Sequence, residues 1–114
     1  MPHDRQRLGA AGEQAVARRY EEAGYEVLER NWRCREGEID LILRLRRVLV
    51  FCEVKTRSDD RFGTPAEAVT RAKRDQVRQV ARRYLDECPF RFREIRFDVG
   101  AVTPTSVEVI EGAF

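Results

Sequence analysis

The sequence predicts an α/β fold in which helices flank a mixed central sheet. Two stretches repeat apolar residues at helical spacing, and five shorter runs have the composition or alternation of strands. In chain order these elements give helix, three strands, helix and two strands, which is typical of a sheet with helices packed on it. The chain has 114 residues, enough for one domain that buries roughly two thirds of its unfolded surface. We therefore expect residues 1–114 to form a single domain.

The first helix is predicted from Arg5 to Ala23, because its small and apolar residues follow helical spacing and Gly24 supplies a C-terminal stop. Gly9 and Gly12 each weaken a helix by up to about 1 kcal/mol relative to alanine. They indicate either a close backbone approach or a late helix start. The first strand is predicted from Tyr25 to Trp32.

Two apolar runs separated by Arg46 and Arg47 are predicted to form an antiparallel hairpin. A polar loop over residues 33–37 leads into the first run, residues 38–45, and the second run covers residues 48–56. A tight primed turn prefers Asn or Gly to arginine. A four-residue loop would keep the same pairing, so both connections remain open.

This hairpin would bring two acidic side chains together. With Leu45 opposite Val48, Asp40 meets Glu53, and Lys55 follows on the same face as Glu53. Directly opposed residues have Cβ atoms roughly 4.5–5.5 Å apart, where like charges are destabilising. A divalent cation with Lys55 alongside is the simplest compensation. The alternative is that Glu53 and Lys55 are a solvated strand end.

The second helix is predicted to begin at the capping box Thr64–Glu67, which places a proline at the first helical position. It runs to about Glu87, with a kink or break near Thr70. Two further strands are predicted over Arg93–Val102 and Val107–Ile110.

A basic ridge on the second helix is a candidate nucleic-acid contact. Its arginines recur three and four residues apart with few acidic residues beside them: Arg71, Arg74, Arg78 and Arg82. An ordinary solvated helix face is the commoner explanation of such a pattern, and contact with phosphate is the alternative.

The composition excludes several classes of protein. A net charge of +2 is too small for a polycation, and no apolar run approaches the ~20 residues of a membrane span. The N-terminus does not lead into a signal peptide, so we expect a soluble cytoplasmic protein. Three cysteines without CxxC spacing argue against a disulfide framework or a zinc site. Because His3 is the only histidine, most histidine-dependent catalysis is excluded.

The remaining acidic and basic residues suit metal-assisted chemistry on a phosphodiester. Mg²⁺ prefers oxygen ligands and keeps several waters, so two or three carboxylates suffice. The ion would lower the pKa of a bound water and neutralise charge on the phosphate, and Lys55 would stabilise that same charge. Glu13 supplies a further carboxylate on the first helix, although the helix dipole also favours a negative charge there.

Short motifs cover nearly the whole chain in a recognisable order: Gly12-Glu13, Gly37-Glu38-Ile39-Asp40-Leu41-Ile42, Phe51-Cys52-Glu53-Val54-Lys55-Thr56-Arg57, Lys73, Arg96-Phe97-Asp98-Val99 and Ala113-Phe114. This order resembles the YraN family of small bacterial proteins. That family is itself similar to the PD-(D/E)XK nuclease superfamily, in particular to archaeal Holliday junction resolvases. The resemblance implies a restriction-endonuclease-like core.

The resemblance also implies roles for individual residues. It makes Lys55 the catalytic lysine and gives three acidic residues to the catalytic metal site, with Mg²⁺ or Mn²⁺ as the ion: Glu13, Asp40 and Glu53. Arg57 and Lys73 fall on basic positions near the site, where they would contact the nucleic-acid backbone. The proline of the superfamily name is absent, since Gly37-Glu38-Ile39 precedes Asp40.

Three functions remain in competition. The first is a metal-dependent nuclease acting on DNA rather than RNA, with branched or single-stranded substrates; junction substrates would favour a symmetric homodimer. The second is a nuclease-fold protein that binds nucleic acid without cutting it. The third is a protein-interaction domain. The presence of all four proposed catalytic residues favours the enzyme: Glu13, Asp40, Glu53 and Lys55.

Overall fold

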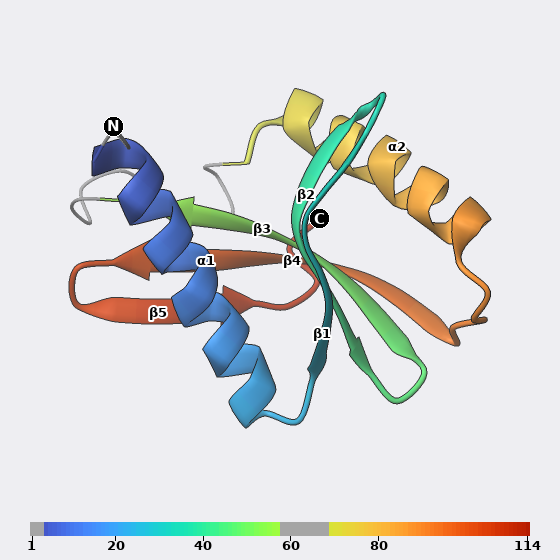
Figure 1. Ribbon diagram of the computed structural model, residues 1–114, viewed down its shortest axis with the longest axis horizontal. Helices are drawn as coiled ribbons and strands as arrows, with labels where there is room; N and C mark the ends of the chain where they lie inside the picture. Colours follow the sequence, from blue (N-terminus) through green and yellow to red (C-terminus); the bar gives the residue numbers. More distant parts are fainter. Residues whose placement is uncertain (1–3, 58–68) are drawn as a thin grey trace.

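The computed structural model describes residues 4–57 and 69–114 and has the predicted order of elements (Figure 1). The bounds are α1 Asp4–Glu22, β1 Glu26–Cys34, β2 Gly37–Leu45, β3 Val48–Thr56, α2 Arg71–Glu87, β4 Glu94–Thr103 and β5 Ser106–Ile110. The capping box predicted at Thr64–Glu67 lies outside the described residues, and α2 begins at Arg71 with Thr70 as its N-cap. No helix in these two described ranges is long and apolar enough to span a membrane.

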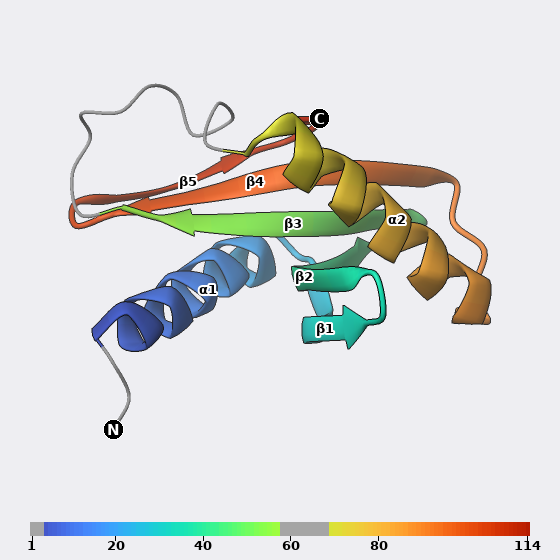
Figure 2. The ribbon, with the colours of Figure 1, turned by 90° about the horizontal axis from the view of Figure 1, so that it is seen from above.

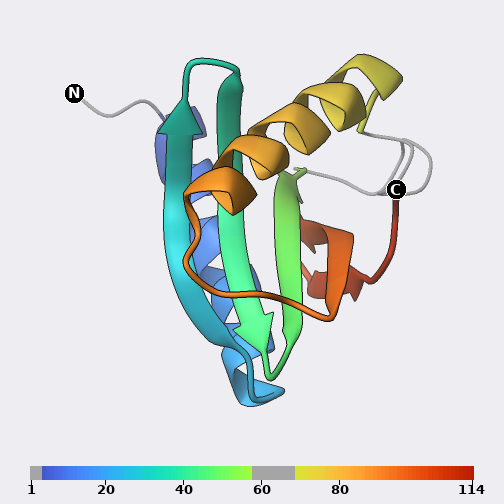
Figure 3. The same ribbon diagram turned by 90° about the vertical axis from the view of Figure 1, so that its right-hand side faces the viewer.

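The strands form one mixed sheet in the order β1-β2-β3-β4-β5. β3 and β4 are parallel, whereas the other neighbouring pairs are antiparallel. A parallel pair needs a crossover connection, and α2 lies in the connection between β3 and β4. Figure 2 shows α1 and α2 on opposite sides of the sheet, and Figure 3 shows α2 crossing in front of it with α1 behind. The predicted α/β class is therefore confirmed.

β3 lies at the centre of the sheet and is buried on both faces. Val50 and Cys52 pack with α1, and Leu49 and Phe51 pack with α2. The predicted alternation of this strand is confirmed. Since Glu53 follows Leu49 and Phe51 at the same spacing, it lies on the α2 face of the sheet.

The predicted pairing of the β2–β3 hairpin is confirmed from Leu45–Val48 to Leu41–Cys52, where the ladder ends. The predicted pair of Asp40 with Glu53 lies one position beyond it and is not formed as a ladder pair. Arg46 and Arg47 form a two-residue turn in which Arg46 adopts φ +54°. A positive φ at the first turn position alone is the sign pattern of a type II′ turn, which normally takes glycine there. The hairpin therefore closes tightly despite its unsuitable turn residues.

The loop predicted over residues 33–37 is wrong in its bounds. β1 continues to Cys34, which pairs with Gly37, so that Arg35 and Glu36 alone form the turn. Gly37 adopts φ +149°, a conformation that side-chain-bearing residues rarely take. The conformation of Gly37 therefore allows β1 and β2 to be joined by a turn of only two residues.

Gly12 marks a close approach between α1 and β3. A Cβ atom at Gly12 would overlap the side chain of Thr56, whereas Gly9 has open space around it. α1 begins at Asp4, so the alternative of a late helix start is wrong. The contact at Gly12 holds the neighbouring Glu13 near the end of β3.

Candidate active site

The alternation of side chains between the two faces of the sheet is interrupted in β2 at Asp40. Ile39 and Ile42 are three positions apart, yet both pack on the α2 side of the sheet, whereas Leu41 packs on the α1 side. The sequence of residues 38–45 alternates regularly, and regular alternation would place Ile39 on the same side as Leu41. The structure places it on the opposite side. Local interruptions of this kind re-aim side chains and are common next to active sites.

β1 changes face at the matching point, Asn31. The ladder pairs the residues on either side of Asn31 with those on either side of Asp40 and leaves these two unpaired. Before the interruption, Arg30 Nη1 donates to Gln14 Oε1 of α1 at 3.0 Å, and after it Trp32 packs on the α2 side. Asn31 has φ +51°, which asparagine tolerates better than most residues. The two strands therefore turn together.

Glu13 is tied to this point through Asn31. The Asn31 Nδ2 donates to Glu13 Oε2 at 3.1 Å. Burial and the nearby charge of Asp40 raise the pKa of Glu13, while the Asn31 hydrogen bond lowers it. Sequence reasoning missed Asn31 as a site residue. The available signal was an asparagine inside a strand-like run, where it is normally depleted.

Asp40 uses its carboxylate in place of a backbone ladder bond. Its Oδ2 accepts the backbone N–H of Val54 at 2.8 Å, just beyond the Leu41–Cys52 pair that ends the β2–β3 ladder. Burial raises the pKa of Asp40, and the bond from Val54 lowers it. The Asp40 carboxylate is thus fixed at the end of the hairpin. It is close enough to Glu53 for their charges to repel, although the two residues are not a ladder pair.

Glu53 is the least satisfied acidic group of the site. Its residue is 2% exposed, and its Oε1 is buried with no hydrogen-bond partner among the described residues. Its Oε2 lies 3.6 Å from Lys73 Nζ. Burial, and then repulsion from Asp40, raise the pKa of Glu53 to about 7. Burying an incompletely partnered carboxylate is costly, and the charges of Lys73 and Lys55 and the backbone N–H of Asp40 lower the pKa of Glu53 without offsetting its burial completely.

Lys55 lies in β3 two residues after Glu53, and Arg57 directly follows the end of the strand. The charge of Lys55 lowers the pKa of both Asp40 and Glu53, so its ammonium lies within electrostatic range of the pair. The backbone N–H of Arg57 donates to the carbonyl of Val102 at 2.8 Å, which fixes the end of the strand. The structure therefore brings Lys55 to the predicted site.

Lys73 is held at the site by the first turn of α2. Its backbone N–H donates to Thr70 Oγ1 at 3.2 Å, and its Nζ donates to Gln76 Oε1 at 3.4 Å. Gln76 Nε2 donates in turn to the carbonyl of Glu36 at 3.1 Å. A Cβ atom at Gly37 would overlap the Gln76 side chain. The β1–β2 turn thereby anchors the residues that orient Lys73, a role for Gln76 that the sequence did not indicate.

Part of the predicted basic ridge contacts the end of the chain. The guanidinium groups of Arg74 and Arg78 each lie 5.7 Å from the ring centroid of Phe114, and that of Arg78 lies 5.8 Å from Phe97. Arg71 is exposed in the first turn of α2. These stacked arginines have a structural role in addition to any contact with phosphate, which remains a prediction.

Asp40 and Glu53 are the residues that fit a metal ion best. The orphaned Glu53 oxygen and the mutual repulsion of the two carboxylates would both be relieved by a cation. Within the described part of the chain, no group of three or more Asp, Glu, His or Cys residues is placed to enclose an ion. Mg²⁺ tolerates such a site, because it keeps several of its waters.

Comparison with known proteins gives a consistent family. Residues 12–102 match the sequence model described as "Uncharacterised protein family UPF0102", a span that includes every candidate site residue. A UPF0102 protein of Frankia alni is 49% identical over 112 residues, covering 94% of this chain and 93% of that protein. A UPF0102 protein of Nocardia farcinica is 51% identical over 102 residues, covering 90% and 80%. A UPF0102 protein of Moorella thermoacetica is 44% identical, and the match covers both chains completely.

Proposed function

The chain belongs to the UPF0102 family, also called the YraN family, and we propose that it is a metal-dependent nuclease that hydrolyses phosphodiester bonds in DNA. The observation that carries the proposal is the buried, unpartnered Oε1 of Glu53 beside Asp40. A structural carboxylate would be hydrogen-bonded at this depth. An arrangement of this kind is typical of a group that is completed by a ligand.

The residues of the site would divide the work of hydrolysis. Asp40 and Glu53 would hold Mg²⁺ or Mn²⁺, which when bound supplies an acidified water and neutralises phosphate charge. Lys55 would stabilise the charge that develops on the phosphate. Glu13, oriented by the Asn31 amide, would accept or position a proton on the α1 side. Branched or single-stranded DNA is the proposed substrate, and a symmetric dimer would present two such sites.

The proposed alternative is a protein that binds nucleic acid without cutting it. One observation favours it: Lys73 Nζ already lies 3.6 Å from Glu53, so a lysine partly neutralises the carboxylate without a metal. In that protein Lys55, Arg57 and Lys73 would contact phosphate, and the acidic pair would have no reactive role. Metal binding separates the two functions.

The deciding experiment is calorimetric titration of Mg²⁺ and Mn²⁺ into the protein and into Asp40→Asn. Glu38→Gln is a matched control, because Glu38 is an acidic neighbour engaged with Arg33 at 3.2 Å. The same proteins are then incubated with single-stranded, duplex and four-way-junction DNA. Binding and metal-dependent cutting that are lost in Asp40→Asn but kept in Glu38→Gln would support the nuclease. Absence of metal binding even with DNA present would favour the alternative.

A further inference from the structure

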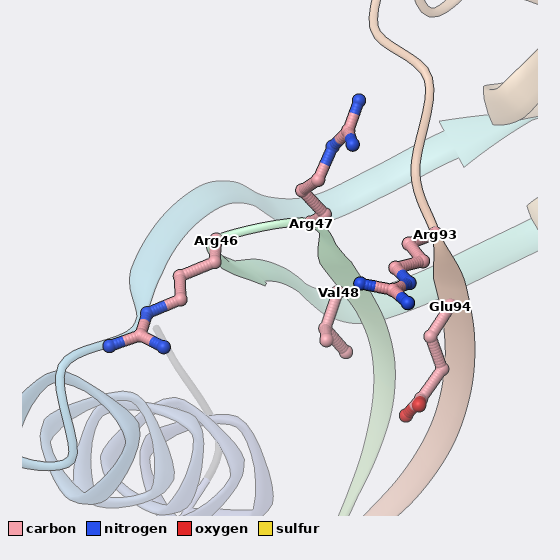
Figure 4. A pocket seen from close by; sticks show the side chains of 5 residues that line it. All are labelled: Arg46, Arg47, Val48, Arg93 and Glu94. Carbon is pink, nitrogen blue, oxygen red and sulfur yellow. The ribbon is translucent and has the colours of Figure 1, made fainter.

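The end of the sheet opposite Asp40 and Glu53 carries three arginines whose guanidinium groups have no partner among the described residues. Arg46 and Arg47 form the β2–β3 turn, and Arg93 precedes β4; with Val48 and Glu94 they line a pocket of about 530 Å³ (Figure 4). All three arginines are exposed. None of their guanidinium groups makes an ion pair or hydrogen bond to another described residue. Their charge is therefore available to a ligand.

The backbone fixes these arginines relative to one another. The carbonyl of Arg47 accepts the N–H of Arg93 at 2.8 Å and that of Glu94 at 3.3 Å. In Figure 4 the side chains of Arg46 and Arg47 leave the turn in different directions, and the Glu94 carboxylate points away from Arg47. Glu94 thus does not neutralise the turn. The charges are spread out, as suits an extended anion rather than a single small one.

Exposed apolar side chains accompany the arginines. Among the described residues, the large apolar side chains that are exposed are Phe90, at 55%, and Ile95, at 37%. Ile95 pairs with Leu49 in the first part of β3, next to the turn. The guanidinium of Arg44 lies 5.2 Å from the centroid of the Phe90 ring, a distance at which a cation is attracted to the ring and orders it. Arg44 Nε also donates to the carbonyl of Arg46 at 2.9 Å, so Phe90 is connected to the turn through Arg44, outside the pocket itself. Aromatic rings beside basic side chains are the combination that binds single-stranded nucleic acid.

We propose that Arg46, Arg47, Arg93 and Phe90, which we call the arginine turn, form a second contact surface for a single strand of nucleic acid. The arginines bind phosphates and Phe90 stacks on a base. Five positions of β3 separate Val48 from Glu53, about 17 Å at 3.3–3.4 Å per residue, so a strand of several nucleotides would reach from the turn to Glu53. This inference rests on the proposed function in that it needs a nucleic-acid ligand, but it does not need cleavage.

The test compares two variants that lose the same charge. Arg46→Gly with Arg47→Ser removes two cations and gives the turn residues that suit its positive φ. Arg18→Gln with Arg19→Gln removes two exposed cations from α1. Binding of a labelled 16-nucleotide single strand is measured by fluorescence anisotropy across a salt series in chelator, where no metal-dependent cutting occurs. Phe90→Leu is measured beside them.

The arginine-turn variant should bind roughly tenfold more weakly at moderate salt. The slope of log affinity against log salt should fall by about 1.4, since a single strand gives about 0.7 for each lost phosphate contact. Phe90→Leu should lower affinity roughly fivefold with an unchanged slope, because stacking does not release counterions. The α1 control should keep the wild-type slope.

Three outcomes would overturn the proposal: an unchanged slope in the arginine-turn variant, an equal fall in the α1 control, or no binding of any strand by the wild-type protein. The two proposals fail separately. If the wild-type protein cleaves DNA and the arginine-turn variant binds the strand normally, only the proposed role of the arginine turn is rejected. Binding that depends on the arginine turn, without metal-dependent cleavage, removes only the nuclease.

Discussion

Asp98 and Glu53 are both buried carboxylates on neighbouring strands, but their surroundings differ completely. Asp98 accepts two hydrogen bonds from Arg96, one from the Tyr20 hydroxyl and one from the backbone N–H of Gly112, at 2.7–3.0 Å. Glu53 has one oxygen with no partner among the described residues and one at 3.6 Å from a lysine. The burial of Asp98 is fully compensated, whereas that of Glu53 is not.

The difference separates a carboxylate that the fold itself satisfies from one that is a candidate for binding a ligand. Asp98 connects α1, β4 and the segment after β5 through its four hydrogen bonds, and its contact with Arg96 raises the pKa of that guanidinium. Both acids belong to motifs that resemble the YraN family, so sequence alone gives them equal weight. Their hydrogen bonds assign Asp98 to the fold and leave Glu53 as the candidate site residue.

The largest expected effect is on stability at Asp98. Asp98→Ala should lower the free energy of unfolding by about 3–5 kcal/mol, because it removes the acceptor of four hydrogen bonds and leaves the buried Tyr20 hydroxyl without that partner. Among the described residues, Arg96 would keep only its contacts with Glu111 and Tyr25. Tyr20→Phe removes a single hydrogen bond and should cost about 1 kcal/mol. Urea unfolding followed by the fluorescence of Trp32, the single tryptophan, measures both. An Asp98→Ala protein as stable as wild type would end the structural assignment.

The next effect concerns cleavage. Glu53→Gln and Lys55→Ala should each lower the rate of DNA cleavage by about 10²–10³-fold or more, as expected when a group that stabilises transition-state charge is removed. Both proteins should remain folded by circular dichroism. Active variants would show that these residues have no part in the reaction, and unfolded ones would place Glu53 in the same class as Asp98.

The third prediction again concerns the free energy of unfolding, but here the substitution of a buried carboxylate, Glu53→Gln, should stabilise the protein, whereas Asp98→Ala destabilises it. Glu53 has a folded pKa of about 7 against an ordinary value of 4.5, so the folded state binds the proton more tightly. The unfolding free energy of the metal-free protein should therefore fall as pH rises from about 4.5 through 7. Glu53→Gln should remove this loss and be more stable than wild type at pH 8 in chelator by about 2–3 kcal/mol. Urea midpoints at pH 5 and pH 8 measure it; a less stable Glu53→Gln at pH 8 would contradict the assignment.

The smallest effect tests the link between Asn31 and Glu13. Asn31→Gly keeps a residue that accepts φ +51° but removes the amide that donates to Glu13. Cleavage should fall about tenfold, in the range of an outer hydrogen bond to a reacting group, while stability changes by less than about 1 kcal/mol. A pH–rate profile supplies the control, because its acidic limb should shift toward higher pH when the Asn31 bond no longer lowers the pKa of Glu13. An unchanged rate and profile would leave Asn31 with a structural role in β1 only.

Local patterns predicted most of the fold. Period-two alternation gave the bounds of β3, and the parity of the hairpin brought Asp40 and Glu53 to one end of it. Loop bounds were less well predicted, because the tight turn before Gly37 depends on a backbone angle that composition does not reveal. Residue spacing thus specifies which side chains share a face as long as a strand stays regular.

For the candidate site, the sequence predicted the positions of side chains only where the strands are regular. The run around Asp40 alternates evenly in sequence, so nothing local indicated that Ile39 would pack on the α2 side. The bridge from Gln76 to the carbonyl of Glu36 spans 40 positions, and the stacking of Arg78 on Phe114 likewise joins distant segments. Contacts of this kind arise from packing and are absent from any short stretch of sequence.

Because β3 is buried on both faces, the reactivity of one of its side chains, the Cys52 thiol, would depend on ligand binding on the other face. Cys52 lies in the α1 core one residue before Glu53, and burial raises the pKa of its thiol. A thiol reagent can modify Cys52 only when this core opens, whereas Cys34 and Cys88 are partly exposed. A ligand that binds the closed site lowers the open population in proportion to its saturation. The rate of Cys52 alkylation, relative to that of the other two thiols, would therefore report the saturation of the ligand site proposed at Glu53.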